Sequence, residues 1–238
     1  MRVKSSSLIE RVTEIALYVS GKGLAALPDV FEDARFHDVT YLRRACERHG
    51  ICLVEDEILP AAANRLAIAV PIEGAPFIVL DRSLSTPEAK LVPLAHELSH
   101  VALGHLSMPS FTSAGYSACL RGPDDLLFTV YPSETEIEAD ILAMMAIMPD
   151  SYLDGVVEQS IFIPTVSLAR THGLDVDYVA ARVQLYRAIH GYVRSRALFR
   201  ALPRDPLSSP DAGKWFTAEF SNKHYLERIA MIRYGVIL

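Results

Sequence analysis

The sequence contains few cysteines and no long apolar segment, and each scarcity excludes a class of protein. Its three cysteines are odd in number and follow no paired spacing, so we expect no disulfide framework, three buried thiols and a reducing cytoplasm. They are Cys46, Cys52 and Cys119. The longest apolar run, residues 141–148, is too short to cross a bilayer. Because Glu10 and Glu14 stand where a secretory signal would be apolar, we expect no signal peptide and no membrane partner.

The charged residues are unevenly distributed along the chain. The formal net charge is -6, yet residues 181–238 hold 10 Lys and Arg against 4 Asp and Glu, whereas residues 1–180 hold 13 against 25. With 238 residues and 50% hydrophobic content, the chain can bury one substantial core. We therefore expect an acidic globular domain that is followed by a basic tail.

The segment His-Glu-Leu-Ser-His at residues 96–100 has the residue types and spacing of a catalytic zinc site. Two histidines four apart lie one turn above each other on a helix, so His96 and His100 can bind the same ion. Glu97 is turned by about 100° from His96, which lets its carboxylate reach a metal-bound water without being a ligand. Zinc would lower the pKa of that water toward about 7, and Glu97 would take its proton and return it to the leaving amine.

The residues on either side of this segment predict that it lies within a helix. Thr86 is a typical N-cap, Pro87 suits the first helical position, and Gly104 favours a stop. Pro93 should bend the helix three residues before the first histidine. We expect the helix to run through the core with its polar side chains facing inward.

A zinc site of this kind needs a third protein ligand. One known pattern places a glycine seven and a histidine ten residues beyond the first histidine, but leucines, Leu103 and Leu106, occupy these positions. The neighbouring pair Gly104 and His105 does not restore the pattern, because a shift by one residue turns a helical side chain by about 100°. We interpret His105 as a positive charge at the helix end.

Glu136 is the preferred third ligand. Ser133 is a typical N-cap and predicts a helix that ends before Pro149. Glu136 and Asp140 share one face of this helix, so Glu136 could bind the metal while Asp140 holds a ligand histidine by its other ring nitrogen. One alternative stays open, because Ser133 and Glu136 also have the spacing of a capping box. Glu138 is turned by about 200° from Glu136 and is the weaker candidate.

Three segments of the chain together resemble the ImmA/IrrE-type metallopeptidases. They are residues 77–80, the segment 96–105, and Glu136-x-x-Ala139-Asp140-x-x-Ala143 ending at Met148-Pro149. The resemblance covers roughly residues 38–190, and it implies a zincin of the gluzincin type with one Zn2+ ion. The ligands would be His96, His100 and Glu136, with Glu97 as general base. Members of that family act in bacterial and phage regulation by cutting a repressor, which implies a specific protein substrate such as a repressor in a stress-response or mobile-element circuit.

Residues 106–132 form a long connection between the two predicted metal helices. A loop of this length in a compact domain is usually functional, so it could form a lid or a wall of the cleft. Three of its polar side chains could stabilise the oxyanion of the transition state, namely Tyr116, Arg121 and Tyr131. The sequence does not choose among them, and a packing or surface role is the alternative for each.

The predicted fold is α+β, with a zincin-like metallopeptidase domain in which a small mixed sheet packs on helices. Beyond the two metal helices, the pattern predicts helices at 8–20 and 40–49, a strand at 51–54, and a hairpin of 65–72 and 75–80. The first helix should end at Gly21 and Gly23. An edge strand beside a zincin site can pair with an extended peptide, and we place 75–80 at or near that edge, with plain sheet core as the alternative.

After Pro149 the sequence predicts a helical C-terminal region. Residues 165–171 and 176–186, joined at Gly173, have the spacing of a helix-turn-helix-like element. Arginines in and after it could contact nucleic acid phosphates, although a solvated surface is their more common role. These are Arg182, Arg187, Arg194, Arg196 and Arg200. We divide the chain into a metallopeptidase domain at 1–160, the helical element at 161–200, and a linker with an amphipathic tail at 201–238.

Three functions from different classes are compatible with these observations. The favoured one is a cytoplasmic zinc-dependent endopeptidase that acts on a protein or peptide substrate, with nucleic acid as a less expected partner. The first alternative is a non-catalytic zinc-binding regulator that contacts DNA or a protein partner through its basic helical C-terminal region. The second is a housekeeping peptidase or another zinc hydrolase.

Overall fold

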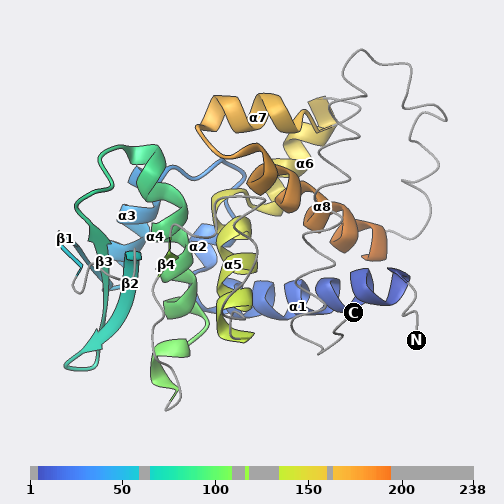
Figure 1. Ribbon diagram of the computed structural model, residues 1–238. Helices are drawn as coiled ribbons and strands as arrows, with labels where there is room; N and C mark the ends of the chain where they lie inside the picture. The colour runs from blue at the N-terminus through green and yellow to red at the C-terminus, as the bar shows by residue number, and fades with distance from the viewer. Residues whose placement is uncertain (1–4, 59–64, 109–115, 118–133, 160–162, 194–238) are drawn as a thin grey trace. The chain divides into compact units, whose positions relative to one another are not determined.

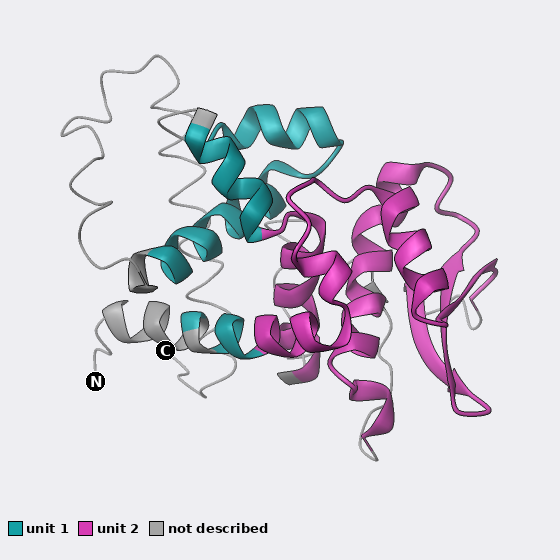
Figure 2. Cartoon of the chain, turned by 180° about the vertical axis from the view of Figure 1, so that it is seen from behind, with its two compact units in different colours: residues 1–18, 150–238 teal, residues 19–149 magenta. Residues whose placement is uncertain are grey.

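The computed structural model describes residues 5–58, 65–108, 116–117, 134–159 and 163–193 (Figure 1). The chain divides into two compact units, one formed by residues 19–149 and the other by residues 1–18 and 150–238 (Figure 2). The boundary near the N-terminus falls within helix α1, Ser5–Ala26. No helix in the described ranges is long and apolar enough to span a membrane.

The unit of residues 19–149 contains a sheet whose strand order is β1-β3-β2-β4. Its strands are β1 at Cys52–Asp56, β2 at Arg65–Ile72, β3 at Ala75–Asp81 and β4 at Tyr116–Ser117. Strands β2 and β3 form the predicted hairpin, and both turn residues, Glu73 and Gly74, have positive φ of 51° and 84°. Left-handed backbone at both positions is typical of a two-residue hairpin turn that matches the strand twist.

Residues 75–80 lie next to the edge strand β1 but do not form the edge themselves, so the alternative of an interior strand applies. Strand β3 pairs in parallel with β1 on one side and antiparallel with β2 on the other, so it is an interior strand. The alternation of buried side chains along it, with Ile78 and Leu80 fully buried, indicates only which face is covered. It carries no information about the number of hydrogen-bonded neighbours, which depends on the distant strand β1.

Two helices position the candidate site, α4 at Pro87–Ala102 and α5 at Glu134–Ile147. Helix α4 begins as predicted, because the Thr86 hydroxyl accepts a hydrogen bond from the Ala89 amide at 3.2 Å and Pro87 is the first helical residue. It packs against β2 and β3 on one side and against α5 on the other (Figure 1). Small buried residues of α5, Ala139 and Ala143, permit this close approach.

The apolar run at residues 141–148 is buried throughout. Its first seven residues form the second half of α5, and Met148 directly follows the helix. Two short segments precede the sheet, α2 at Pro28–Phe31 and α3 at Val39–Arg48. The Asp38 side chain caps α3 by accepting from the Tyr41 amide at 2.8 Å. Helix α3 packs against β1 and α4, so it completes the core around the first metal helix.

The predicted end of the first helix is wrong, since α1 continues through Gly21 and Gly23 to Ala26. The structure gives a packing reason for Gly23. A Cβ atom at this position would lie 2.7 Å from Leu142 Cδ1 and 2.8 Å from Phe31 Cε2. Glycine is therefore present because neighbouring side chains leave no room for a larger residue, and not because the helix stops there.

The described part of the other unit contains α6 at Asp150–Gln159, α7 at Thr165–His172 and α8 at Val176–Val193. Gly173 ends α7 with a φ of 63°, as expected for a left-handed helix cap. The two helices of the predicted element are therefore present, although α8 runs beyond residue 186. Arg182 is fully buried and pairs with Asp150, so its proposed contact with phosphate is wrong. Arg194, Arg196 and Arg200 lie outside the described residues.

The cysteine prediction is correct for Cys46, which is fully buried and whose pKa is raised to about 12 by burial. It is wrong for Cys52, which is exposed at the start of the outer strand β1. Cys119 lies outside the described residues.

Candidate metal centre

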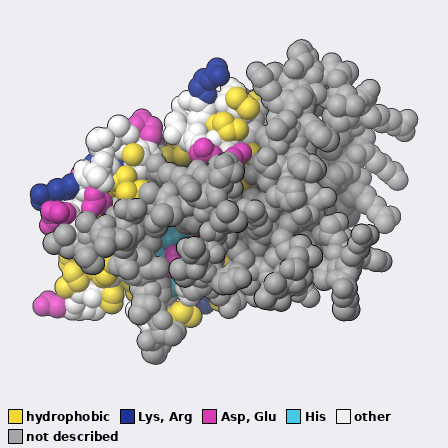
Figure 3. All heavy atoms as spheres, viewed as in Figure 1, with side chains coloured by type: hydrophobic (Ala, Val, Ile, Leu, Met, Phe, Trp, Pro, Cys, Tyr) yellow, Lys and Arg dark blue, Asp and Glu magenta, His cyan; other side chains and the backbone are white. Residues whose placement is uncertain are grey.

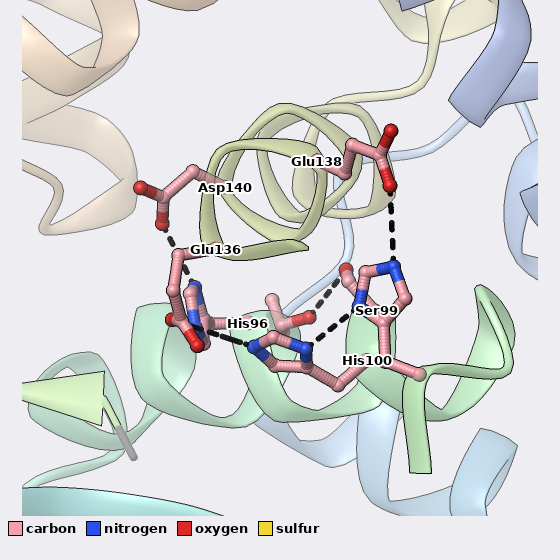
Figure 4. Close-up of polar contacts among 8 residues, drawn as sticks. His96, Ser99, His100, Glu136, Glu138 and Asp140 are labelled. Carbon is pink, nitrogen blue, oxygen red and sulfur yellow. Dashed lines mark hydrogen bonds and ion pairs between the residues drawn. The ribbon is translucent and has the colours of Figure 1, made fainter. Parts of the chain in front are cut away.

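Three predicted ligand side chains from two helices meet at one point. His96 and His100 extend from α4, and Glu136 extends from the first turns of α5 (Figure 4). The Nε2 atoms of the two histidines are 3.1 Å apart. Glu136 Oε2 lies 3.1 Å from His96 Nε2 and 3.5 Å from His100 Nε2. The carboxylate of Glu136 is thus directed at both imidazoles, as a third ligand requires.

These distances fit a small divalent cation. Around a tetrahedral ion with ligands at about 2.0–2.1 Å, neighbouring ligand atoms are separated by roughly 3.3–3.4 Å. The three separations in this cluster lie on either side of that value. His96 and His100 are 1% and 2% exposed in their side chains and Glu136 is 14% exposed, so the cluster is largely shielded from solvent. In Figure 3, histidine and acidic side chains lie together near the middle of the face that is shown.

The electrostatics of the cluster favour positive charge. Burial alone would raise the pKa of Glu136, but its contacts with His100 and His96 lower it strongly. Burial alone would lower the pKa of His96, yet Asp140, Glu136 and Glu97 together raise it to about 10. The raised pKa of His96 reflects the carboxylates around it, and the lowered pKa of Glu136 reflects the two histidines beside it. A divalent ion bound by these three side chains would replace the positive charge that protons otherwise supply.

Asp140 lies beside His96, as expected for the residue that was predicted to support this ligand. Its Oδ1 is 2.8 Å from His96 Nδ1, on the side of the ring opposite to the Nε2 atom that faces the cluster. A proton on Nδ1 donates to the carboxylate, which leaves the lone pair of Nε2 directed at Glu136 and His100. This contact fixes the tautomer of His96 that can bind a metal.

The comparison with known families agrees with this geometry. A family model described as the IrrE N-terminal-like domain, peptidase family M78, matches residues 46–184. The chain belongs to this family. The match contains both helices that carry the cluster, and the resemblance to ImmA/IrrE-type proteins is thereby confirmed. The M78 family consists of metal-dependent peptidases, so its members act on proteins or peptides. Neither a curated protein nor a solved structure matches the chain significantly.

Two residues of this M78 domain take part in the site although the sequence prediction gave them other roles. His105 follows Gly104, whose φ of 73° reverses the chain after α4, and it begins the short 3-10 helix η2 at His105–Ser107. Its Nδ1 lies 2.8 Å from His100 Nδ1. Its Nε2 lies 3.2 Å from Glu138 Oε2.

The interpretation of His105 as a charge at the helix end is therefore wrong. The residue is 2% exposed and its ring stands between His100 and Glu138. Glu138 does point away from Glu136, as its position on α5 predicted, but it reaches the site through His105 (Figure 4). A glycine directly before the histidine was the usable signal, because a left-handed residue at a helix end folds the next residues back along the last turn.

The remaining predicted residues are placed as follows. Glu97 is fully buried, and its charge acts on His96, so the two groups are close. The Ser99 hydroxyl donates to the Ala95 carbonyl at 2.7 Å and is thus occupied within α4. Tyr116 lies in β4, where only the backbone is described, and Arg121 and Tyr131 lie outside the described residues. Their role at the oxyanion stays a prediction.

Proposed function

We propose that this M78 protein is a zinc-dependent endopeptidase of the gluzincin type. One Zn2+ ion would be held by His96, His100 and Glu136, with Asp140 supporting His96. The convergence of three ligand atoms at 3.1–3.5 Å from one another is the observation that supports this proposal most directly. Two neutral imidazoles and one carboxylate are a donor set that zinc prefers for hydrolysis, with a fourth position left for water or substrate.

Glu97 would act as the general base and then as the general acid. A zinc ion held by His96, His100 and Glu136 would supply a Lewis acid for the scissile carbonyl and would make the attacking water more acidic. Glu97 takes the proton from that water and delivers it to the nitrogen of the leaving amine. Its complete burial and its electrostatic effect on His96 support this role, because they place the Glu97 carboxylate inside the site. His96 and His100 keep their Nε2 lone pairs for the metal.

The substrate would be a specific regulatory protein, such as a transcriptional repressor in a stress-response or mobile-element circuit. Membership in the M78 family supports a protein substrate in general. The repressor, the cytoplasmic location and the domain boundaries at 160 and 200 stay predictions from the sequence. The alternative is a non-catalytic regulator with a DNA-binding C-terminal region. It has one phosphate-contacting arginine fewer than the sequence suggested, because Arg182 is buried.

The decisive experiment measures metal content and cleavage in the same variants. Glu97→Gln should keep about one zinc per chain and lose cleavage by about 10²–10⁴-fold, since general acid–base catalysis contributes that much. His96→Ala should lose the metal as well. Glu88→Gln is the matched control, because Glu88 is an exposed acid in the first turn of the same helix.

The cleavage assay would follow fragments of candidate repressors co-expressed with the full chain, read on a gel. Wild-type activity in the Glu97→Gln variant would refute the assigned base. Zinc binding without cleavage of any candidate, in wild type and variant alike, would instead favour the non-catalytic regulator.

A further inference from the structure

A chain of three polar side chains leads from the metal cluster into the protein. His100, His105 and Glu138 are joined by contacts of 2.8 Å and 3.2 Å (Figure 4). The two rings are 2% exposed and the Glu138 side chain is 12% exposed. These groups come from three different elements, α4, η2 and α5. Polar groups this deeply buried are costly unless their hydrogen bonds are satisfied, so the arrangement is a specific one.

The positions of the protons on His100, His105 and Glu138 follow from the geometry. His100 Nε2 faces Glu136 and His96, and it must present a lone pair there to bind a cation. Its proton is then on Nδ1, which donates to His105 Nδ1. His105 must accept at Nδ1, so its own proton is on Nε2 and donates to Glu138 Oε2. Reversing the order would put a proton on His100 Nε2 inside the cluster and block the metal.

We propose that His105 and Glu138 are positioning residues that hold His100 in the metal-binding tautomer and orientation. This inference rests on the proposed metal site and adds two residues to it. The two histidine ligands would be supported differently, because His96 contacts the carboxylate of Asp140 directly whereas His100 reaches a carboxylate through a second imidazole. Helix α5 would thus supply three acids to one site, one as ligand and two as supports.

The test is zinc affinity, measured on the full chain by competition with a chromophoric chelator, with circular dichroism as the check on folding. His105→Ala should bind zinc about 10–100-fold more weakly, as expected when a group that orients a metal ligand is removed. Glu138→Ala should weaken binding in the same direction. Because Glu138 acts through His105, adding Glu138→Ala to His105→Ala should cause no further loss, whereas adding Asp140→Asn should multiply the loss.

A matched pair of substitutions separates positioning from packing. Asparagine at 105 keeps an acceptor where His105 Nδ1 stands, so it preserves the contact with His100 and loses the one with Glu138. Glutamine at 105 places a donor near the former Nε2, so it preserves the contact with Glu138 instead. We expect His105→Asn to bind zinc more tightly than His105→Gln. This comparison holds even if His105→Ala fails to fold.

His37→Ala is the control for loss of a buried imidazole. His37 is fully buried in the same unit, and its Nδ1 lies 2.7 Å from the Ala146 carbonyl oxygen, away from the cluster. The substitution His37→Ala should lower the stability of the protein and leave its zinc affinity unchanged. Wild-type affinity in His105→Ala, or equal losses from Glu138→Ala with and without His105, would overturn the inference. A wild-type chain that takes up no zinc would overturn the proposed function, and this inference with it.

Discussion

Replacing Arg182 by methionine should destabilise the protein more than any surface substitution. Arg182 in α8 is fully buried and pairs with Asp150, the first residue of α6. His190 Nε2 lies 3.5 Å from the other carboxylate oxygen. Burial alone would raise the pKa of Asp150, but its contacts with His190 and Arg182 lower it from 3.8 to about 2. That shift corresponds to about 2 kcal/mol of stability at neutral pH.

The loss in Arg182→Met should exceed this value, because the substitution leaves a partly buried carboxylate without its guanidinium partner. Breaking a buried pair from one side typically costs about 3–5 kcal/mol, and we expect a loss in that range. Chemical denaturation at pH 7, followed by circular dichroism, measures it. The double variant Arg182→Met with Asp150→Asn should recover part of the loss, since it removes the unpaired charge. Arg170→Met, at an exposed arginine of α7, is the control and should stay within about 0.5 kcal/mol of wild type.

The pH dependence supplies a second readout with a defined sign. The folded-state pKa of Asp150 is lowered, so its contribution is present above about pH 4 and is lost as the pH falls toward 2. The difference in unfolding free energy between wild type and Arg182→Met should therefore shrink in that interval. A variant that loses less than about 1 kcal/mol at pH 7, or a difference that grows on acidification, would refute the reasoning.

Two further predictions concern α5 and its neighbours. Glu136→Gln removes the charged ligand, so zinc affinity should fall at least tenfold in chelator competition, and unchanged affinity would exclude Glu136 as a ligand. Gly23→Ala places a methyl group 2.7 Å from Leu142 Cδ1, so it should lower the unfolding free energy by about 1–3 kcal/mol. Gly21→Ala is its matched partner, because a Cβ there meets nothing within 4 Å, and it should stabilise α1 by up to about 1 kcal/mol. Equal effects of the two glycine substitutions in denaturation would contradict the packing explanation.

Local signals predicted the elements that carry the site. The start of α4 was predictable because Thr86 and Pro87 determine capping and backbone angle without help from distant residues. The β2–β3 turn was predictable for the same reason, since Gly74 tolerates positive φ. The helical period then placed Glu136 and Asp140 on one face of α5, and the structure brings both to His96.

Features that depend on distant partners were not predictable from these patterns. Gly23 resembles a helix stop until Leu142 and Phe31 are seen beside it. The interior position of β3 depends on its pairing with β1, which no alternation along β3 reveals. His105 resembles an exposed helix-end residue because its burial depends on Glu138, which follows it by 33 positions. In each case the deciding contact joins segments that are far apart in the sequence.

The ligands of the proposed site stand on two helices, and Glu136 follows His100 by 36 positions in the chain. An ion that binds only the folded arrangement adds about 1.4 kcal/mol of stability for each tenfold excess of free ion over its dissociation constant. Bound zinc would therefore stabilise the packing of α4 against α5, and its loss would weaken that packing. Cellular supply of the ion would then govern how much intact protein persists, so metal starvation would lower its abundance before any change in its synthesis.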